Sequence, residues 1–411
     1  MTLSSDSDPD STESTDSVAH FGARIAKLRK IHGLTQEGLA LRVNLSYSMI
    51  RKIERGERTA SQSLIAAVAR TLRVNVFDIT EQPYGTRTAN VAAEQSGVPF
   101  LRQALVEGDD PDPDTPLLAL DDLRPLVSRL KELDRRGAHS EAVRDLPDLL
   151  KKLHLLRWQE GADSQSDVNE LLAESYGYAV VALYRLGHLD LAHLADERAR
   201  AAAAKGLDPV RAAVAEWHHA LILLFDGAYS AGTRTLDRAE SFVEEAPAGA
   251  ASTAVRGAIQ LRRAVLAARQ ADAGMANAAL LDAGRFVEQG QDAANYYGTK
   301  FSGGNLAIHQ VSVPVELADG VVAVTRASRI HIPDSIAPSR RGHYWIDLAQ
   351  GWFLYGNRAK SLDALQQARR IAPQVTRYHP QVHETVHALA ARDSRATSSL
   401  HEFAAWCGAK H

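Results

Sequence analysis

The sequence predicts an all-α protein in which a small five-helix domain at the N-terminus is followed by a long α-solenoid. Apolar residues recur at helical spacing through most of the 411 residues, and no stretch shows the alternation that a half-buried strand needs. Beyond residue 116, turn residues separate the amphipathic stretches at intervals of about 36 to 50 residues. Such a period is typical of helix pairs that must stack to bury their apolar faces.

Residues 19–80 carry the signals of a bundle that contains a helix-turn-helix. A first helix is predicted to end at Gly33, which suits a C-terminal cap. Thr35 and Ser46 are placed to cap the second and third helices through their hydroxyl groups. Asn44 occupies the turn between these helices, where a left-handed residue is needed. The last two helices of the bundle are predicted near residues 61–72 and 75–79.

The third helix of this bundle has an apolar inner face at Ile50 and Ile53 and a polar outer face. Helix-turn-helix motifs insert the N-terminal half of this helix into the major groove of DNA. Charge supports the same interpretation, because residues 19–80 hold eleven Lys and Arg against four acids, in a chain whose net charge is −3. We therefore predict a DNA-binding domain. The predicted base-reading residues are Tyr47, Ser48, Arg51 and Lys52.

The segment resembles the Cro/phage-repressor family of helix-turn-helix domains, often called XRE, over about sixty residues. The resemblance implies that Tyr47, Ser48 and Lys52 occupy base-reading positions and that Gln36 holds a phosphate. It also implies a structural pair, Arg29 and Glu54, that ties the first helix to the third. We further expect phosphate contacts from exposed arginines around the motif. The predicted phosphate-binding residues are Gln36, Arg42, Arg55 and Arg58.

The remaining segments are predicted from composition. Residues 1–18 hold five acids and no base, which predicts a disordered acidic tail. Residues 81–116 are rich in turn residues and are predicted to be a linker. Cys407 is the only cysteine, and neither a signal peptide nor a membrane span is indicated, so we expect a cytoplasmic protein without membrane association.

Residues 117–411 are predicted to form the solenoid, a sensor and dimerisation domain of about six or seven helix pairs. The clearest unit begins at Leu171 and turns at Gly187, and it is similar to a tetratricopeptide helix pair. The whole arrangement looks like a class of regulators abundant in actinobacteria, and more broadly like peptide-sensing repeat regulators of Gram-positive bacteria. This resemblance implies a homodimer that binds a double-stranded DNA operator and responds to a peptide or small-molecule effector.

A polar and aromatic stripe in the solenoid is a candidate ligand pocket. Two sets of residues at helical spacing, one repeat apart, place Asn and Arg side chains where they could hold a polar ligand. The alternative is packing between repeats, with Tyr344 in the core. The residues of this candidate pocket are Phe301, Asn305, His309, Arg341, Tyr344 and Asp347.

His383-Glu384-Thr385-Val386-His387 matches the H-E-x-x-H pattern of zinc peptidases. We reject that function because a third ligand at suitable spacing is lacking, and we interpret the two histidines as surface residues of a capping helix. No catalytic residue, metal or cofactor is predicted. Another function class stays open: an interaction scaffold or antitoxin-like binder whose DNA-binding head is only autoregulatory.

Overall fold

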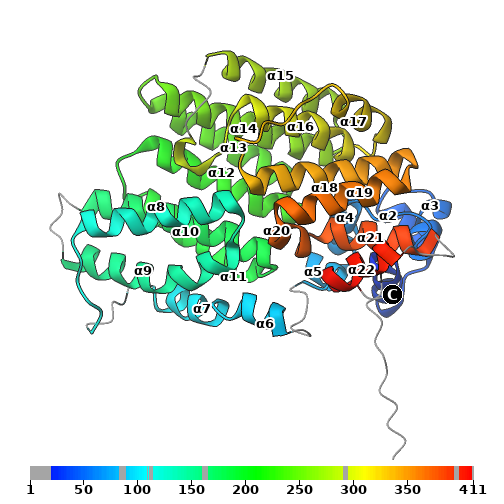
Figure 1. Cartoon of the computed structure of the whole chain (residues 1–411), viewed down its shortest axis with the longest axis horizontal. Coiled ribbons are helices and arrows are strands. Elements are labelled where there is room, and N and C mark those ends of the chain that lie inside the picture. Colours follow the sequence, from blue (N-terminus) through cyan, green and yellow to red (C-terminus); the bar gives the residue numbers. More distant parts are fainter. Residues whose placement is uncertain are drawn as a thin grey trace, which may run out of the picture.

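The computed structural model describes residues 20–82, 89–108, 110, 114–159, 165–289, 295–392 and 398–409. Over these residues the chain is helical and contains no strand, so the predicted all-α fold class is confirmed (Figure 1). The predicted acidic tail lies outside the described residues. None of the helices in the described ranges is long and apolar enough to cross a membrane.

The N-terminal domain, which we call the head, has the five helices predicted for it. They are α1 (Phe21–Ile31), α2 (Gln36–Arg42), α3 (Tyr47–Glu54), α4 (Gln62–Leu72) and α5 (Val76–Thr80). The predicted caps are present: the Thr35 hydroxyl accepts from the Gly38 amide, and the Ser46 hydroxyl accepts from the Met49 amide. Asn44 is left-handed, with φ of 55°. Local hydrogen bonds to capping side chains therefore determine where α2 and α3 begin.

The predicted linker contains two helices. They are α6 (Ala89–Gln95) and α7 (Val98–Glu107). Leu101 and Leu105 of α7 are fully buried in the largest hydrophobic cluster of the described chain, where α7 contacts α9. This part of 81–116 is therefore integrated into the repeat domain and does not act as a spacer. Part of the acidic proline run that follows lies outside the described residues.

Beyond the linker, antiparallel helix pairs follow one another. They are α8 (Leu120–Arg136) with α9 (His139–Gln159), α10 (Gln165–Leu186) with α11 (Leu189–Ala203), α12 (Pro209–Phe225) with α13 (Tyr229–Glu245), α14 (Ala250–Arg269) with α15 (Ala273–Gln289), α16 (Gly303–Glu316) with α17 (Gly320–Ala327), α18 (Pro338–Tyr355) with α19 (Arg358–Ile371), and α21 (Pro380–Arg392) with α22 (Ser398–Cys407). Short elements η1 (Tyr296–Gly298) and α20 (Pro373–Arg377) connect some of them. Gly137, Gly187, Gly227 and Gly356 end first helices of pairs with positive φ.

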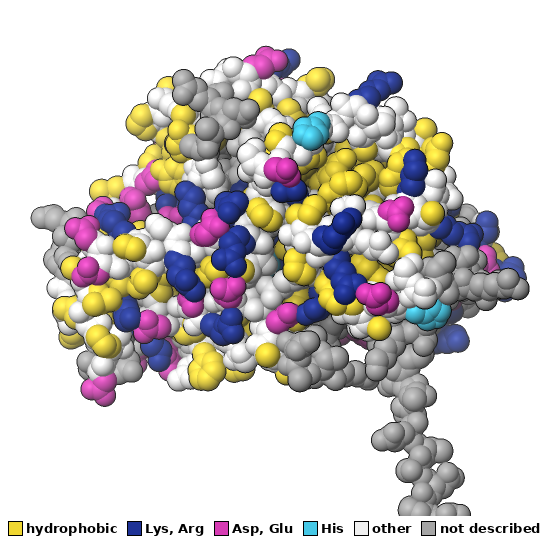
Figure 2. Space-filling view, in the orientation of Figure 1, with side chains coloured by type: hydrophobic (Ala, Val, Ile, Leu, Met, Phe, Trp, Pro, Cys, Tyr) yellow, Lys and Arg dark blue, Asp and Glu magenta, His cyan; other side chains and the backbone are white. Residues whose placement is uncertain are grey.

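The first helices of successive pairs contact one another from α8 to α18, and α18 then contacts α8 again. The backbone amide of Ser140 donates to the Gln374 side chain at 2.9 Å across this closure. The repeat array is therefore closed on itself, and we call it the ring. On the face seen in Figure 2, basic and acidic side chains of the ring are interspersed.

Candidate nucleic-acid interface and ligand cavity

Helix α3 places the predicted base-reading residues on the solvent side of the head. Ile50 and Ile53 are buried against the other head helices, which fixes the rotation of α3 about its axis. Tyr47, whose exposed fraction is 45 %, lies with three further exposed residues on the opposite face. These further exposed residues are Ser48, Arg51 and Lys52. The structure thus places all four on an accessible surface. Tyr47 and Ser48 lie at the N-terminal end of α3, which helix-turn-helix motifs insert into a major groove, and Arg51 and Lys52 follow in its last turn.

The predicted phosphate-binding residues differ in their surroundings. Arg55 and Arg58 are exposed, and Arg55 lies 3.5 Å from the Glu57 carboxylate. Arg42 is also exposed and donates to the Gly38 carbonyl oxygen. Gln36 is only partly exposed, and its amide donates to the Glu54 carboxylate at 2.7 Å. Gln36 is therefore already held by the head before any DNA is present.

The Arg29–Glu54 pair holds α1 against α3, as the resemblance implied. Two hydrogen bonds join the guanidinium to the carboxylate, at 2.6 and 2.9 Å, and Arg29 also donates to the Leu34 carbonyl oxygen. The side chains are only 8 % and 5 % exposed. Hydrogen bonding to Glu54 raises the pKa of Arg29. This bidentate pair fixes the position of α3 relative to α1.

The head is docked onto the ring at widely separated points. The carboxylate of Glu384 in α21 accepts from the backbone amides of Phe21, at 3.3 Å, and Ala60, at 3.0 Å. From α4 of the head, the Arg70 guanidinium donates to the Gly227 carbonyl oxygen at 2.6 Å. The side chain of Ala66 also packs into a hydrophobic cluster of α12, α13 and α14. The head is therefore in direct contact with both early and late repeats.

Glu384 belongs to the H-E-x-x-H segment, and its surroundings assign it a structural role. It is buried, and its two oxygens are both used by head amides. His383 is hydrogen-bonded with the Arg377 carbonyl oxygen. The prediction that these histidines lie on the surface was wrong, because His383 and His387 are only 3 % and 8 % exposed. Among the described residues, no cluster of three or more His, Cys, Asp or Glu could hold a metal ion.

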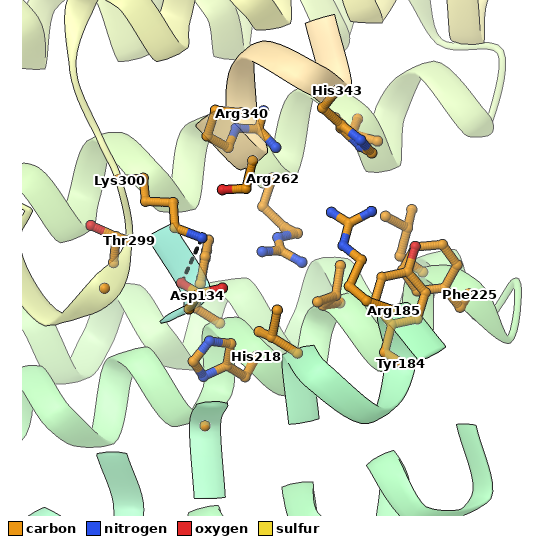
Figure 3. Close-up of a pocket in the computed structure, with 18 of the residues that line it drawn as sticks. Asp134, Tyr184, Arg185, His218, Phe225, Arg262, Thr299, Lys300, Arg340 and His343 are labelled. Carbon is orange, nitrogen blue, oxygen red and sulfur yellow. Dashed lines mark ion pairs between the residues drawn. The ribbon is translucent and has the colours of Figure 1, made fainter. Parts of the chain in front are cut away.

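A cavity of about 190 Å³ lies inside the ring. The first helices of the pairs, from α8 to α18, contribute most of its lining (Figure 3). Helices α4 and α5 of the head close part of it, through Gln62, Val76, Phe77 and Thr80. The cavity is therefore shared by the ring and the head, and a molecule that fills it would touch both.

Three of the six residues predicted for the ligand pocket line this cavity: Asn305, His309 and Asp347. The other three lie elsewhere. Phe301 packs against Gly257, where an added Cβ atom would lie only 2.0 Å from the Cζ atom of Phe301. Tyr344 is buried beside Trp345, and Arg341 pairs with Asp334. The neighbouring Arg340 lines the cavity in place of Arg341.

Seven further lining residues are not among those predicted for the pocket, and two of them, Trp217 and His218, are predicted from the sequence to be packing residues. The seven are Asp134, Arg185, Trp217, His218, Arg262, Lys300 and Arg340. The sequence does contain a signal for them, because the polar residues Arg185, Arg262 and His218 interrupt the apolar stretches of first helices. The rest of each stretch is typical of packing between helices. Which side of each helix faces the inside depends on ring closure, and the local sequence does not encode that directly.

The imidazoles around the cavity are neutral at pH 7. Burial lowers the pKa of His139, His218 and His309 to about 3. Burial and nearby cations, Arg185 foremost, hold the pKa of His343 and His379 well below the ordinary value. These imidazoles therefore offer neutral donors and acceptors, and the positive charge of the cavity comes from Arg and Lys.

Comparison with known proteins concerns mainly the head. Residues 25–79 match the family described as HTH_3, helix-turn-helix. Over 59 residues, the chain is 37 % identical to the uncharacterized HTH-type transcriptional regulator YazB of Bacillus subtilis (strain 168), and the match covers 14 % of this chain and 86 % of that protein. A weaker likeness, with a TM-score of 0.33 and 12 % identity, covers 86 % of this chain and 94 % of Bacillus thuringiensis PlcR, in its crystal structure with the peptide PapR7 and DNA.

Proposed function

We propose that this chain, which belongs to the HTH-type transcriptional regulators, binds a specific double-stranded DNA operator through α3 of its head. The exposed polar face of α3 supports this, because the side chains of Arg51 and Lys52 form no hydrogen bond or ion pair with any described residue. Tyr47, Ser48, Arg51 and Lys52 would read bases. Gln36 and three exposed arginines would hold phosphates. These arginines are Arg42, Arg55 and Arg58.

Replacing Lys52 with Ala tests the base-reading role. We expect Lys52→Ala to cost ~1–3 kcal/mol of binding free energy on the operator and much less on random DNA, because a base contact discriminates between sequences. Arg58→Ala should weaken both complexes alike and reduce the slope of log K against log salt by about one. Operator fragments recovered by genome-wide mapping of bound sites provide the DNA, and fluorescence anisotropy measures the affinities.

Arg285→Ala is the matched control for these variants. Arg285 is an exposed arginine of α15 in the ring, paired with Asp282, so its removal should leave both affinities and the salt slope unchanged. Equal losses on operator and random DNA for Lys52→Ala would contradict the base-reading role.

We further propose that the ring senses a small ligand in its cavity and thereby changes how the head is held. The observation that carries this proposal is that α4 and α5 of the head line the cavity together with the ring. A ligand that fills the cavity would contact both the head and the ring. It would shift the position of the head on the ring if it binds one such position more tightly than another. The protein would act in the cytoplasm, where its DNA lies.

The repeats would be of the tetratricopeptide-like type found in actinobacterial regulators, and they would also mediate a homodimer. Two heads related by two-fold symmetry would read half-sites about 34 Å apart, one helical turn of DNA. Light scattering of the purified chain and of its DNA complex tests this. A single chain bound to each operator would overturn the dimer.

A further inference from the structure

Three guanidinium groups meet in the ring cavity. They come from Arg185 of α10, Arg262 of α14 and Arg340 of α18, and Figure 3 shows them pointing into the same central space. Each helix belongs to a different repeat, so the cluster exists only because the ring closes. Like charges brought together away from bulk water repel one another, and the arrangement is unfavourable unless something compensates it.

The chain itself provides little compensation for these three charges. Arg340 donates to the Asn305 side-chain oxygen, which is neutral. Arg262 lies over the Trp217 ring, 4.1 Å from its centroid, and its Nη1 is buried without a hydrogen-bond partner among the described residues. Arg185 stands beside the Tyr184 ring. None of the three forms an ion pair with a described acid, whereas most buried charges in proteins are paired.

Three of the four described acids that line the cavity form ion pairs with cations outside this cluster. The Asp134 carboxylate is 2.6 Å from the Lys300 ammonium, as marked in Figure 3. Two further ion pairs join Arg211 with Glu174 and Arg269 with Glu316. Among the described lining residues this leaves one acid, Asp347, against three guanidiniums.

The charge state of these groups leaves a positive cavity at neutral pH. Burial lowers the pKa of Arg262 to about 9 and that of Arg340 to about 10, so both stay charged at pH 7. Burial raises the pKa of Asp347 to about 7, so this carboxyl is only partly ionised there. The cavity therefore has an excess of positive charge that the described residues do not neutralise.

Apolar surface lies next to the cationic cluster. The rings of Tyr184 and Phe225 stack with centroids 4.0 Å apart, beside Arg185 in Figure 3. Leu221, Leu261 and Val265 also line the cavity. A ligand would therefore meet positive charge and, next to it, aromatic and aliphatic side chains.

We propose that the ring cavity binds a small organic oxyanion, a carboxylate or a phosphate ester with an apolar body, held by Arg185, Arg262 and Arg340. Guanidinium groups suit this ligand because their donors match carboxylate and phosphate oxygens two at a time. The inference rests on the proposed role of the cavity as the effector site. It defines the effector as an anion.

The test is thermal unfolding of the full chain with chosen probes and no DNA. Benzoate and phenyl phosphate represent the two oxyanions on an apolar body, benzamide is the neutral counterpart of benzoate, and sodium chloride matches the ionic strength. We expect at least one anion to raise the melting temperature by about 3 °C at about 100 times its Kd, with no rise for benzamide. The anion that acts identifies the source as carboxylate or phosphate.

Arg262→Gln and its sequence neighbour Arg263→Gln form a matched pair. Arg263 is paired with Asp237 and Glu240 and does not line the cavity. Arg262→Gln should raise the melting temperature of the anion-free protein, because it relieves repulsion, and should abolish the anion-dependent rise. Arg263→Gln should keep the anion-dependent rise. If Arg262→Gln does not unfold cooperatively, Arg340→Gln replaces it, with Arg341→Gln as its control.

The proposal is overturned if neither anion exceeds sodium chloride, if benzamide acts as benzoate does, or if the arginine variants retain the full response. Its failure is distinct from failure of the proposed function. Anion binding that leaves operator affinity unchanged would overturn the regulatory link alone, and an absent anion response would leave DNA binding by the head untouched.

Discussion

Glu54→Ala is expected to destabilise the head by ~3–5 kcal/mol, because it leaves the Arg29 guanidinium buried without its counterion. The two hydrogen bonds from Arg29 and the one from Gln36 all end on this carboxylate. Hydrogen exchange measured by mass spectrometry should show faster exchange across α1 to α4 in the intact chain. Exchange in the ring helices far from the head should stay unchanged.

Glu57→Ala is the control for this result. Glu57 is about half exposed and lies 3.5 Å from Arg55, and an exposed pair of this kind contributes ~0–1 kcal/mol. A second check is the double replacement Arg29→Met with Glu54→Leu, which removes both charges and should cost less than Glu54→Ala. Similar losses for Glu54→Ala and Glu57→Ala would show that the buried pair does not hold the head together.

Glu384→Ala is expected to release the head from α21. The variant leaves the amides of Phe21 and Ala60 buried without acceptors, at ~1–3 kcal/mol for each group. These amides regain hydrogen bonds to water when the head separates from the ring. Hydrogen exchange should therefore be faster in peptides that contain them. Glu402→Ala, which removes an exposed acid of α22, is the control and should leave exchange in the head as it is.

The same carboxylate predicts a pH dependence of head docking. Burial raises the pKa of Glu384 to about 7, although two backbone amides and Arg24 act in the opposite direction. Because the pKa of the docked state exceeds the ordinary value of about 4.5, this group's contribution is greatest below pH 4.5 and is lost as the pH rises to about 7. Hydrogen exchange at Phe21 and Ala60 should therefore slow on acidification, after correction for the intrinsic rate.

Glu384→Gln isolates this effect. His20 precedes Phe21 in the chain, and its burial-lowered pKa opposes the trend. Burial lowers the pKa of His383 to about 4, so His383 stays neutral over most of the range. Both histidines remain in the variant. The difference between the parent and Glu384→Gln reports Glu384 alone, and an identical pH profile for the two proteins would contradict the assignment.

The head could be predicted from sequence in detail because its structure is set by local interactions. The hydroxyl caps at Thr35 and Ser46, the left-handed Asn44 and the buried face of α3 all follow from residues a few positions apart. The helix pairs of the ring were predicted for a similar reason, since turns and apolar periodicity mark each pair. These signals need no knowledge of distant contacts.

The ring cavity could not be predicted to the same degree. Arg340 and Arg341 are adjacent, and only the packing of α18 against its neighbours decides that the first lines the cavity and the second pairs with Asp334. The local sequence places the apolar residues of α7 in a linker, because their partners in α9 lie some fifty residues away. The contacts of Glu384 with Phe21 and Ala60 could not be predicted for the same reason, because these partners are more than 300 residues away in the sequence.

The contact of α18 with α8 has an evolutionary consequence. An open solenoid gains or loses a repeat at little cost, because each repeat contacts only its neighbours. Here an inserted or deleted helix pair would separate these two helices and move Lys300 away from Asp134. Homologues that keep the cavity should therefore keep the number of helix pairs and vary in loop length, and their genes should rarely show the duplications by which repeat arrays usually grow.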